Sequence, residues 1–108
     1  MAEKHTEIEV QVQQDWTKNK RGRLFRNDNG WCKTVGRYGL GVGTSDLIGF
    51  ELINDNPIFC VIEVKTKAHK YLTEEQILFL NHIKNFGGRA YVAMETDEGY
   101  KLTEWEGK

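Results

Sequence analysis

The fold is decided by the stretch Leu47-Ile48-Gly49-Phe50-Glu51-Leu52-Ile53-Asn54-Asp55-Asn56-Pro57-Ile58-Phe59-Cys60-Val61-Ile62-Glu63-Val64. Residues 47–53 and 58–64 are rich in β-branched and aromatic side chains, and the four residues between them are a turn signal. This pattern predicts an antiparallel β-hairpin. If the hairpin folds about Asp55 and Asn56, positions pair when their numbers sum to about 111, within one or two residues. Asp46 then lies beside Glu63 and Lys65.

A helix is predicted before the hairpin. Ile8, Val12 and Trp16 recur at every fourth position, which is the spacing of a narrow apolar stripe on a helix over residues 6–17. Glu7 and Glu9 fall in the first turn of this helix, where the exposed backbone amides favour negative charge.

A second helix and further strands complete the predicted order. Thr73 and Gln76 have the spacing of a capping box, and apolar residues follow at helical intervals until Gly87 and Gly88 end the helix. The other expected segments are a short strand at residues 23–26, a turn at 27–30, an irregular glycine-rich loop at 36–43, a buried strand at 89–94 and an edge strand at 100–105. Together they predict a mixed α/β domain with helices on a central sheet.

The composition fits one globular domain over residues 1–108. The chain has 108 residues, 39% hydrophobic and 29% charged, which excludes a disordered or collagen-like protein and leaves no room for a second core. No apolar run approaches the roughly 20 residues that cross a bilayer. The first residues lack the apolar stretch of a signal peptide, so we expect a cytoplasmic location. Cys32 and Cys60 are expected to be free thiols.

A net charge of −1 conceals a basic segment. Between Lys18 and Arg37, seven lysines and arginines stand against one acid, Asp28, which gives a local charge of +6. Such a segment is either a phosphate-contacting face or a solvated charged loop. The candidate nucleic-acid-binding residues are Arg21, Arg23, Arg26 and Arg37, together with Lys67 and Lys70 from the loop that follows the hairpin.

The chemistry-bearing residues lie at one end of the hairpin. Glu63 and Lys65 are two apart in a strand, so their side chains project from the same face, and Asp46 lies beside them. Two carboxylates with backbone oxygens suit Mg²⁺. A lysine beside them can position an attacking water or stabilise the charge of a phosphoryl transition state. The alternative is structural, with a salt bridge between Glu63 and Lys65 and with Asp46 capping a turn.

These residues resemble a known family. Gly43-Thr44-Ser45-Asp46-Leu47-Ile48-Gly49 followed by Val61-Ile62-Glu63-Val64-Lys65 resembles the split acidic motif of the PD-(D/E)XK nucleases, with Ser45 where that motif often has proline. Leu72-Thr73-Glu74-Glu75-Gln76 and Asn85-Phe86-Gly87-Gly88-Arg89-Ala90-Tyr91-Val92-Ala93 are similar to the virus-type replication-repair nuclease (VRR-NUC) branch. The resemblance runs from about residue 7 to residue 94, and the size resembles that of stand-alone phage-encoded members, which would act in a bacterial host cell. It implies an α/β restriction-endonuclease-like core, a central mixed β-sheet flanked by two helices in the order αβββαβ.

The resemblance also implies a site and an activity. The activity is metal-dependent hydrolysis of DNA phosphodiester bonds with Mg²⁺ or Mn²⁺, selective for branched DNA such as a four-way junction. Asp46, Glu63 and the backbone carbonyl of Val64 are expected to bind the metal, while Lys65 serves the nucleophilic water. Gln76 matches a family glutamine, although the capping box also accounts for it.

The first helix is expected to supply one further catalytic and metal-binding acid. Likeness to the helix start of archaeal junction resolvases favours Glu7 over Glu9 for this role. The three histidines, His5, His69 and His82, have no metal-ligand spacing, so we expect them to be surface or structurally satisfied residues.

The expected partners are DNA and a second copy of the chain. One metal site cuts one strand, so a homodimer is predicted, with the edge strand at 100–105 as a candidate interface. The alternative function is a noncatalytic nucleic-acid-binding or assembly module that keeps the nuclease fold. Two acids held beside a lysine argue against that alternative, because a phosphate-binding module gains nothing from them.

Overall fold

The computed structural model describes residues 2–28, 30–34, 36–38, 40–41 and 43–107, with side chains for 4–28, 33–34, 40–41 and 43–107. Its elements in chain order are α1 (Ala2–Lys18), β1 (Gly22–Arg26), β2 (Gly30–Cys32), β3 (Gly36–Tyr38), β4 (Leu47–Ile53), β5 (Asn56–Lys65), α2 (Glu74–Asn85), β6 (Arg89–Thr96) and β7 (Gly99–Glu104). The predicted helices, hairpin and edge strand are confirmed. Among the described helices, none is long and apolar enough to cross a membrane.

The hairpin of β4 and β5 forms the middle of a five-stranded sheet with the order β1-β4-β5-β6-β7. Leu47 pairs with Ile62, so paired positions sum to 109, within the predicted margin of two residues. The two-residue turn causes this shift. Asn54 and Asp55 have φ of 52° and 66°, and β5 already starts at Asn56.

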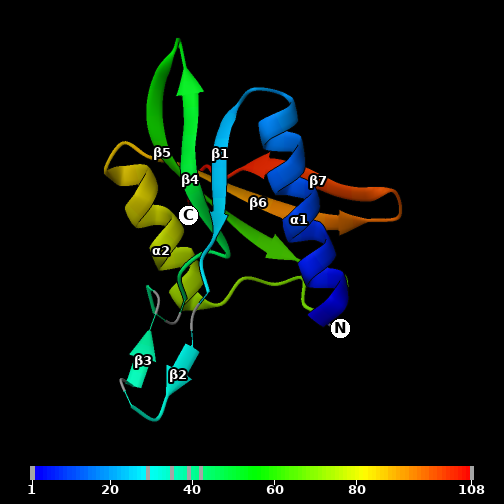
Figure 1. Cartoon of the computed structure of the whole chain (residues 1–108), viewed down its shortest axis with the longest axis vertical. Helices are drawn as coiled ribbons and strands as arrows, with labels where there is room; N and C mark the ends of the chain where they lie inside the picture. Colours follow the sequence, from blue (N-terminus) through cyan, green and yellow to red (C-terminus); the bar gives the residue numbers. More distant parts are fainter. Residues whose placement is uncertain (1, 29, 35, 39, 42, 108) are drawn as a thin grey trace.

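The sheet is mixed because α2 connects two parallel strands. The β5 and β6 strands are parallel, and the neighbouring pairs β1 with β4, β4 with β5, and β6 with β7 are antiparallel. Figure 1 shows α1 and α2 on either side of the sheet, with the small β2–β3 hairpin projecting away from it. This is the predicted α/β architecture with two flanking helices.

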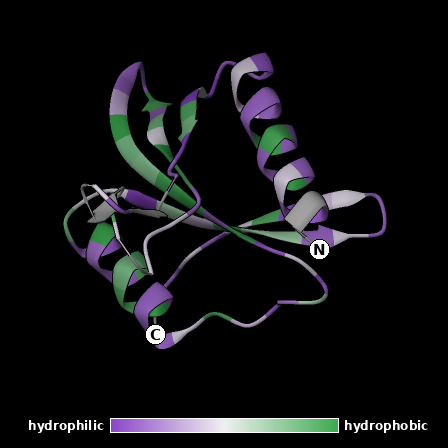
Figure 2. Cartoon of the chain, turned by 60° about the horizontal axis from the view of Figure 1, so that its bottom comes forward, coloured by the Kyte–Doolittle hydropathy of each residue, from purple (hydrophilic) through white to green (hydrophobic). Residues whose placement is uncertain are grey.

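Each helix covers one face of the sheet. The apolar stripe of α1, Ile8, Val12 and Trp16, is at most 2% exposed and packs on a core of alternate sheet residues that includes Ile62 and Val64. The other face packs on α2. That second core is made of Leu80 with Val61 and Ala90, and Figure 2 shows the apolar colour in the strands and in bands on both helices.

One predicted loop is partly wrong. Residues 36–43 were expected to be irregular, but Gly36–Tyr38 forms β3 and pairs with β2. Residues 39 and 42 of that loop, and residue 29 of the predicted turn, lie outside the described residues. Gly43 does have a close neighbour. Its φ is +83°, and a Cβ there would lie 2.5 Å from the Cβ of Glu75 at the start of α2.

Candidate active site

A pocket of about 420 Å³ lies at the end of the sheet where β4 begins and β5 ends. The N-terminal turns of both helices contribute to it. Eleven residues line it: His5, Thr6, Glu9, Arg26, Asp46, Glu63, Val64, Lys65, Thr66, His69 and Gln76. Four of the five side chains predicted to be catalytic, Asp46, Glu63, Lys65 and Gln76, are thus brought together from segments far apart in the sequence.

Asp46 is fixed by the backbone of the neighbouring strand. It directly precedes β4, and its Oδ2 accepts a hydrogen bond from the Val64 amide at 2.8 Å. Burial opposes its ionisation, but hydrogen bonds from His5 and from the Val64 amide outweigh burial, so the pKa of Asp46 is lowered. Asp46 is therefore the carboxylate that stays ionised.

Glu63 is more deeply buried, with 2% of its surface exposed. Its Oε2 accepts a hydrogen bond from Gln76 Nε2 at 3.1 Å, whereas its buried Oε1 has no partner among the described residues. Burial and the negative charge of Asp46 raise the pKa of Glu63 to about 9. The two carboxyl groups therefore need a compensating positive charge if both are to ionise near neutral pH.

Gln76 serves the helix and the pocket together. Thr73 Oγ1 accepts from the Gln76 amide at 3.1 Å, and Gln76 Oε1 accepts from the Thr73 amide at 2.9 Å, which completes the predicted capping box. With its oxygen held there, the side chain points its NH₂ group at Glu63. Both interpretations made for Gln76 from the sequence are therefore compatible with its geometry.

Lys65 lines the pocket with only 7% of its surface exposed. Within the described part of the chain it forms no salt bridge, so the predicted structural alternative, a bridge to Glu63, is absent. A buried lysine without an ion pair is rare in a purely structural role. Its ammonium is available for a group that enters the pocket.

The first-helix acid that lines the pocket is Glu9, and the structure does not bring Glu7, the acid expected from the resemblance, to this pocket. The Glu7 side chain is 68% exposed and lies 3.6 Å from Lys4, on a different groove. Glu9 is 6% exposed, and its Oε1 accepts from Arg26 Nε at 3.0 Å. Two residues two apart on a helix point about 200° apart, so only one of them can face the sheet end.

His5 is a pocket residue that the sequence reasoning missed. Its Nδ1 lies 3.0 Å from Glu9 Oε2 and its Nε2 lies 3.4 Å from Asp46 Oδ2. The hydrogen bonds to Asp46 and Glu9 raise the pKa of His5 to about 10. The signal was the spacing of four between His5 and Glu9, which places both on one helix face.

The basic candidates divide into engaged and exposed side chains. Arg21 donates to Glu51 Oε2 at 2.5 and 3.1 Å and lies 4.0 Å over the Trp16 ring, so its guanidinium is engaged within the fold, and its phosphate contact stays a prediction. Arg26 is paired with Glu9 in the pocket, and Lys67 is paired with Asp97. Exposed side chains with no acidic partner in the described chain are Arg23 and Lys70, and the side chain of Arg37 lies outside the described residues.

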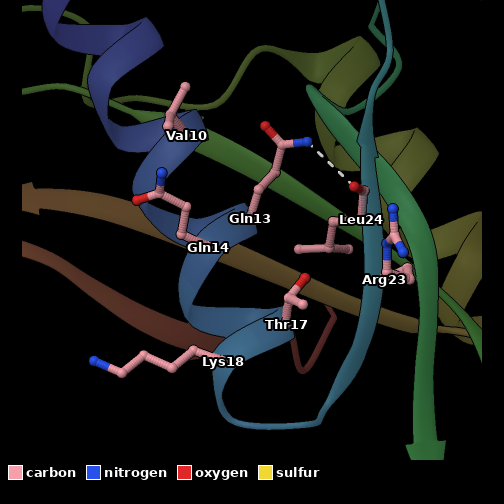
Figure 3. Close-up of a pocket in the computed structure, with 7 residues that line it drawn as sticks. All are labelled: Val10, Gln13, Gln14, Thr17, Lys18, Arg23 and Leu24. Carbon is pink, nitrogen blue, oxygen red and sulfur yellow. Dashed lines mark hydrogen bonds between the residues drawn. The ribbon is translucent and has the colours of Figure 1, made fainter.

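A second groove, between α1 and β1, lacks the chemistry of the pocket. Figure 3 shows its seven lining residues, with Gln13 Nε2 donating to the Leu24 carbonyl at 3.2 Å. The lining contains Lys18 and Arg23 but no carboxylate and no imidazole. The hydrogen bond across this groove links α1 to β1, and the groove is not a candidate active site.

The acidic pocket has the donor set of a divalent-cation site. It combines carboxylate oxygens of Asp46 and Glu63 beside the backbone of Val64, and Glu63 Oε1 is buried with no hydrogen-bond partner in the described part of the chain. Hard cations such as Mg²⁺ take carboxylate and carbonyl oxygens together with water. The residues present therefore fit such an ion.

An open mixed sheet with a helix on each face and an acid-acid-lysine cluster at the ends of its two central strands defines a restriction-endonuclease-like nuclease fold. The VRR-NUC domain family matches residues 4–95, which is most of the chain. The chain belongs to the VRR-NUC family and is thus a member of a nuclease superfamily. No curated protein matches the sequence.

Proposed function

We propose that this protein is a metal-dependent endonuclease that hydrolyses phosphodiester bonds in DNA, with a preference for branched substrates. The observation that carries the proposal is one pocket lined by the half-buried Asp46, the buried Glu63 and the buried Lys65, which has no ion-pair partner among the described residues. A noncatalytic module has no use for a carboxyl group buried at the cost of a raised pKa.

Each residue has a part in the proposed reaction. Asp46, Glu63 and the Val64 carbonyl would hold Mg²⁺ or Mn²⁺, and the chemistry such a cation supplies is polarisation of the phosphate and activation of water. Lys65 holds the attacking water or the developing negative charge on the phosphate oxygens. Gln76 keeps Glu63 in place through its NH₂ group.

The proposed DNA surface lies around the pocket. Lys67 and Lys70 are on the loop that follows β5, directly after Lys65 and Thr66. A DNA backbone that enters the pocket would therefore pass these two lysines. Arg23 extends this surface along β1. Contacts of this kind are independent of base sequence and weaken with salt.

A homodimer is the proposed assembly. The β7 strand lies at the edge of the sheet and pairs with β6 on its other side, so a second copy could add to it edge to edge. A two-fold dimer brings two pockets to opposite strands of one junction. Light scattering at micromolar concentration tests it: a dimer mass and paired cuts support the assembly, and a monomer mass with single nicks rejects it.

Cleavage of defined DNA substrates tests the proposed activity. Supercoiled plasmid, a four-way junction and a single strand are each incubated with the full chain, with Mg²⁺, Mn²⁺ or EDTA. We expect ion-dependent cleavage, fastest on the junction. Glu63→Gln keeps the side-chain shape, and Lys65→Ala removes the ammonium; each should lower the rate about 10²- to 10³-fold, as loss of one preorganised charge does.

Glu98→Gln is the matched control, because Glu98 is exposed on the turn between β6 and β7. Its rate should equal that of the wild type. Ion-independent cleavage, or equal rates for Glu63→Gln and the wild type, would reject the proposal. Tight DNA binding with no cleavage of any substrate by the wild type would favour the noncatalytic module.

A further inference from the structure

The groove between α1 and β1 carries hydrogen-bond donors on both walls. It has a volume of about 610 Å³, and Figure 3 shows the side chains that line it: Val10, Gln13, Gln14, Thr17 and Lys18 from α1, and Arg23 and Leu24 from β1. None of these lining residues is acidic, and Lys18 and Arg23 form no ion pair with any residue that the structure describes. The groove therefore suits an anion.

Both walls of this groove continue to the acidic pocket at the end of the sheet. On β1, Arg23 lines the groove and Arg26 lines the pocket. On α1, Val10 lines the groove and lies one helical turn after Thr6, which lines the pocket. Three residues of a strand span about 10 Å. A chain molecule that leaves the pocket along β1 therefore enters the groove within about 10 Å.

The groove on the other side of α1 has the opposite charge. Val10 and Gln14 line both grooves, so they form the ridge between them. The charged residues that line the second groove are three acids and one lysine: Glu7, Asp97, Glu98 and Lys4. A polyanion is repelled from that side of the ridge and attracted to the side of Lys18 and Arg23.

We propose that the groove between α1 and β1 binds a single-stranded arm of the DNA substrate, with backbone phosphates at Lys18 and Arg23. The proposal rests on the proposed function and names one part of its branched substrate, the unpaired strand that leaves the pocket past Arg26. Gln13 Nε2 donates to the Leu24 carbonyl at 3.2 Å and links the two walls, so the groove is formed before DNA binds.

The lining favours a single strand over a duplex. Val10 is 39% exposed and lies on the same helix face as Gln14 and Lys18, which follow it at intervals of four residues. In a duplex the faces of the bases are stacked inside, so a protein reaches only phosphates, sugars and base edges. In a single strand the base faces are also open to contact, while the phosphates still attract cations. An exposed apolar side chain beside amide and cationic donors meets both requirements.

Binding measured in EDTA tests the proposal without any cleavage. Fluorescence anisotropy gives the affinity of the full chain for one duplex that is blunt or carries a 5′ or 3′ single-stranded arm of about 4 or about 10 nucleotides. The variants Lys18→Ala and Thr17→Glu change the charge of the groove. Lys101→Ala is the control for the first, because Lys101 is exposed on β7 at the opposite edge of the sheet. Gln11→Glu is the control for the second, because Gln11 lines the acidic groove on the other side of α1.

We expect the wild type to bind the arm-bearing duplexes more tightly than the blunt one. Lys18→Ala should weaken binding to arm-bearing DNA about 3- to 5-fold, as loss of one exposed phosphate contact does, and leave blunt DNA unchanged. Thr17→Glu should weaken the same complexes at least as much, since it adds a negative charge to the groove. Both control variants should match the wild type, and circular dichroism melting checks that all variants are folded.

Three results would overturn the groove as a single-strand site and leave the proposed nuclease intact. They are an equal loss on blunt DNA, no loss in either groove variant, and no gain in affinity from an arm in the wild type. If the expected binding pattern is found in a wild type that cuts no substrate, the groove site is supported and only the proposed function is overturned.

Discussion

The exchange of Glu9 for glutamine separates the pocket acid of α1 from its exposed neighbour. Glu9→Gln keeps the shape of the side chain but removes the charge that faces His5 and Arg26. Glu7→Gln makes the same chemical change one half-turn away, where the carboxylate contacts only Lys4 in the described chain. Comparison of the two variants tests which side of α1 faces the pocket, because both make the same Glu-to-Gln change.

The expected loss of stability in each variant follows from the burial of the carboxylate that is replaced. The Glu9 side chain is 8% exposed and accepts from a guanidinium that is 46% exposed, so its charged contact contributes about 1 kcal/mol after screening by water. The exposed pair of Glu7 and Lys4 contributes about 0.3 kcal/mol. If Glu9 orients or binds the cation, its loss should also slow cleavage about 10- to 100-fold, which is about 1.4 to 2.8 kcal/mol of barrier.

Two assays measure these effects. Single-turnover cleavage of an end-labelled junction gives the rate, and urea unfolding followed by circular dichroism gives the free energy of unfolding. We expect Glu9→Gln to lower both and Glu7→Gln to leave the rate at the wild-type value. Equal rates for the two variants, or a slower rate for Glu7→Gln, would refute the placement of Glu9 at the reacting end of the sheet.

Three further predictions concern stability and DNA binding. Arg21→Ala should lower the free energy of unfolding by about 2 kcal/mol, because it removes the nearer of the two guanidinium groups paired with the buried carboxylate of Glu51 and leaves only Arg89, at 3.8 Å. Arg23→Ala should leave stability unchanged and reduce the salt dependence of DNA affinity by about one phosphate contact. Urea unfolding measures the stabilities and fluorescence anisotropy at several salt concentrations measures the affinities; the opposite assignment would contradict the contacts of both arginines. Gly49→Ala should destabilise the sheet by more than about 1 kcal/mol, since a Cβ there would lie 2.0 Å from the Arg23 carbonyl oxygen, and an unchanged melting temperature would count against this packing. Burial raises the pKa of Cys60 to about 12. Between pH 9 and 12 the unfolded chain therefore binds fewer protons than the folded chain, and the free energy of unfolding of the wild type should fall by up to about 1.4 kcal/mol per pH unit relative to Cys60→Ala. If the free energies of unfolding of the two proteins, measured in urea at pH 8 to 10, change with pH in parallel, the raised pKa is disproved.

The hairpin and the helices could be predicted from the sequence because local chemistry determines them. Residues 47–53 and 56–65 carry strand formers, and Asn54 and Asp55 tolerate the positive φ of a two-residue turn. The capping box and the apolar stripe likewise depend on spacing within one element. Three of the expected pocket residues, Asp46, Glu63 and Lys65, follow from that hairpin alone.

The acid of the first helix could not be predicted, because it depends on packing between elements. The stripe Ile8, Val12 and Trp16 shows which side of α1 is buried, but Glu7 and Glu9 flank this stripe on opposite sides. Which flank faces the sheet end depends on the angle at which α1 crosses the strands. His5 was missed for the same reason, since its role appears only when Asp46 lies beside it.

The contacts of Arg21 likewise could not be predicted from the sequence, because they depend on packing between elements. In the sequence it is one of seven basic residues in a short segment, and nothing distinguishes it from Arg23. In the fold it directly precedes β1, donates hydrogen bonds to Glu51 on β4 and lies over the Trp16 ring, where it stabilises the domain. Local charge counts therefore overestimate the phosphate-binding surface, because ion pairs across the sheet neutralise part of it.

The two sets of hydrogen bonds made by Gln76, to Thr73 and to Glu63, restrict which residues can replace it. A capping box accepts either glutamate or glutamine at its third helical residue, but a glutamate here would direct a second carboxylate at the buried Glu63 in place of the NH₂ group. Shorter or apolar residues would lose the bond to Thr73 and free the start of α2. Of the residues that a capping box accepts, only glutamine also donates a hydrogen bond to Glu63. Substitution at position 76 is therefore restricted both by the start of α2 and by the pocket. If either requirement were lost, we expect other residues to become acceptable at this position.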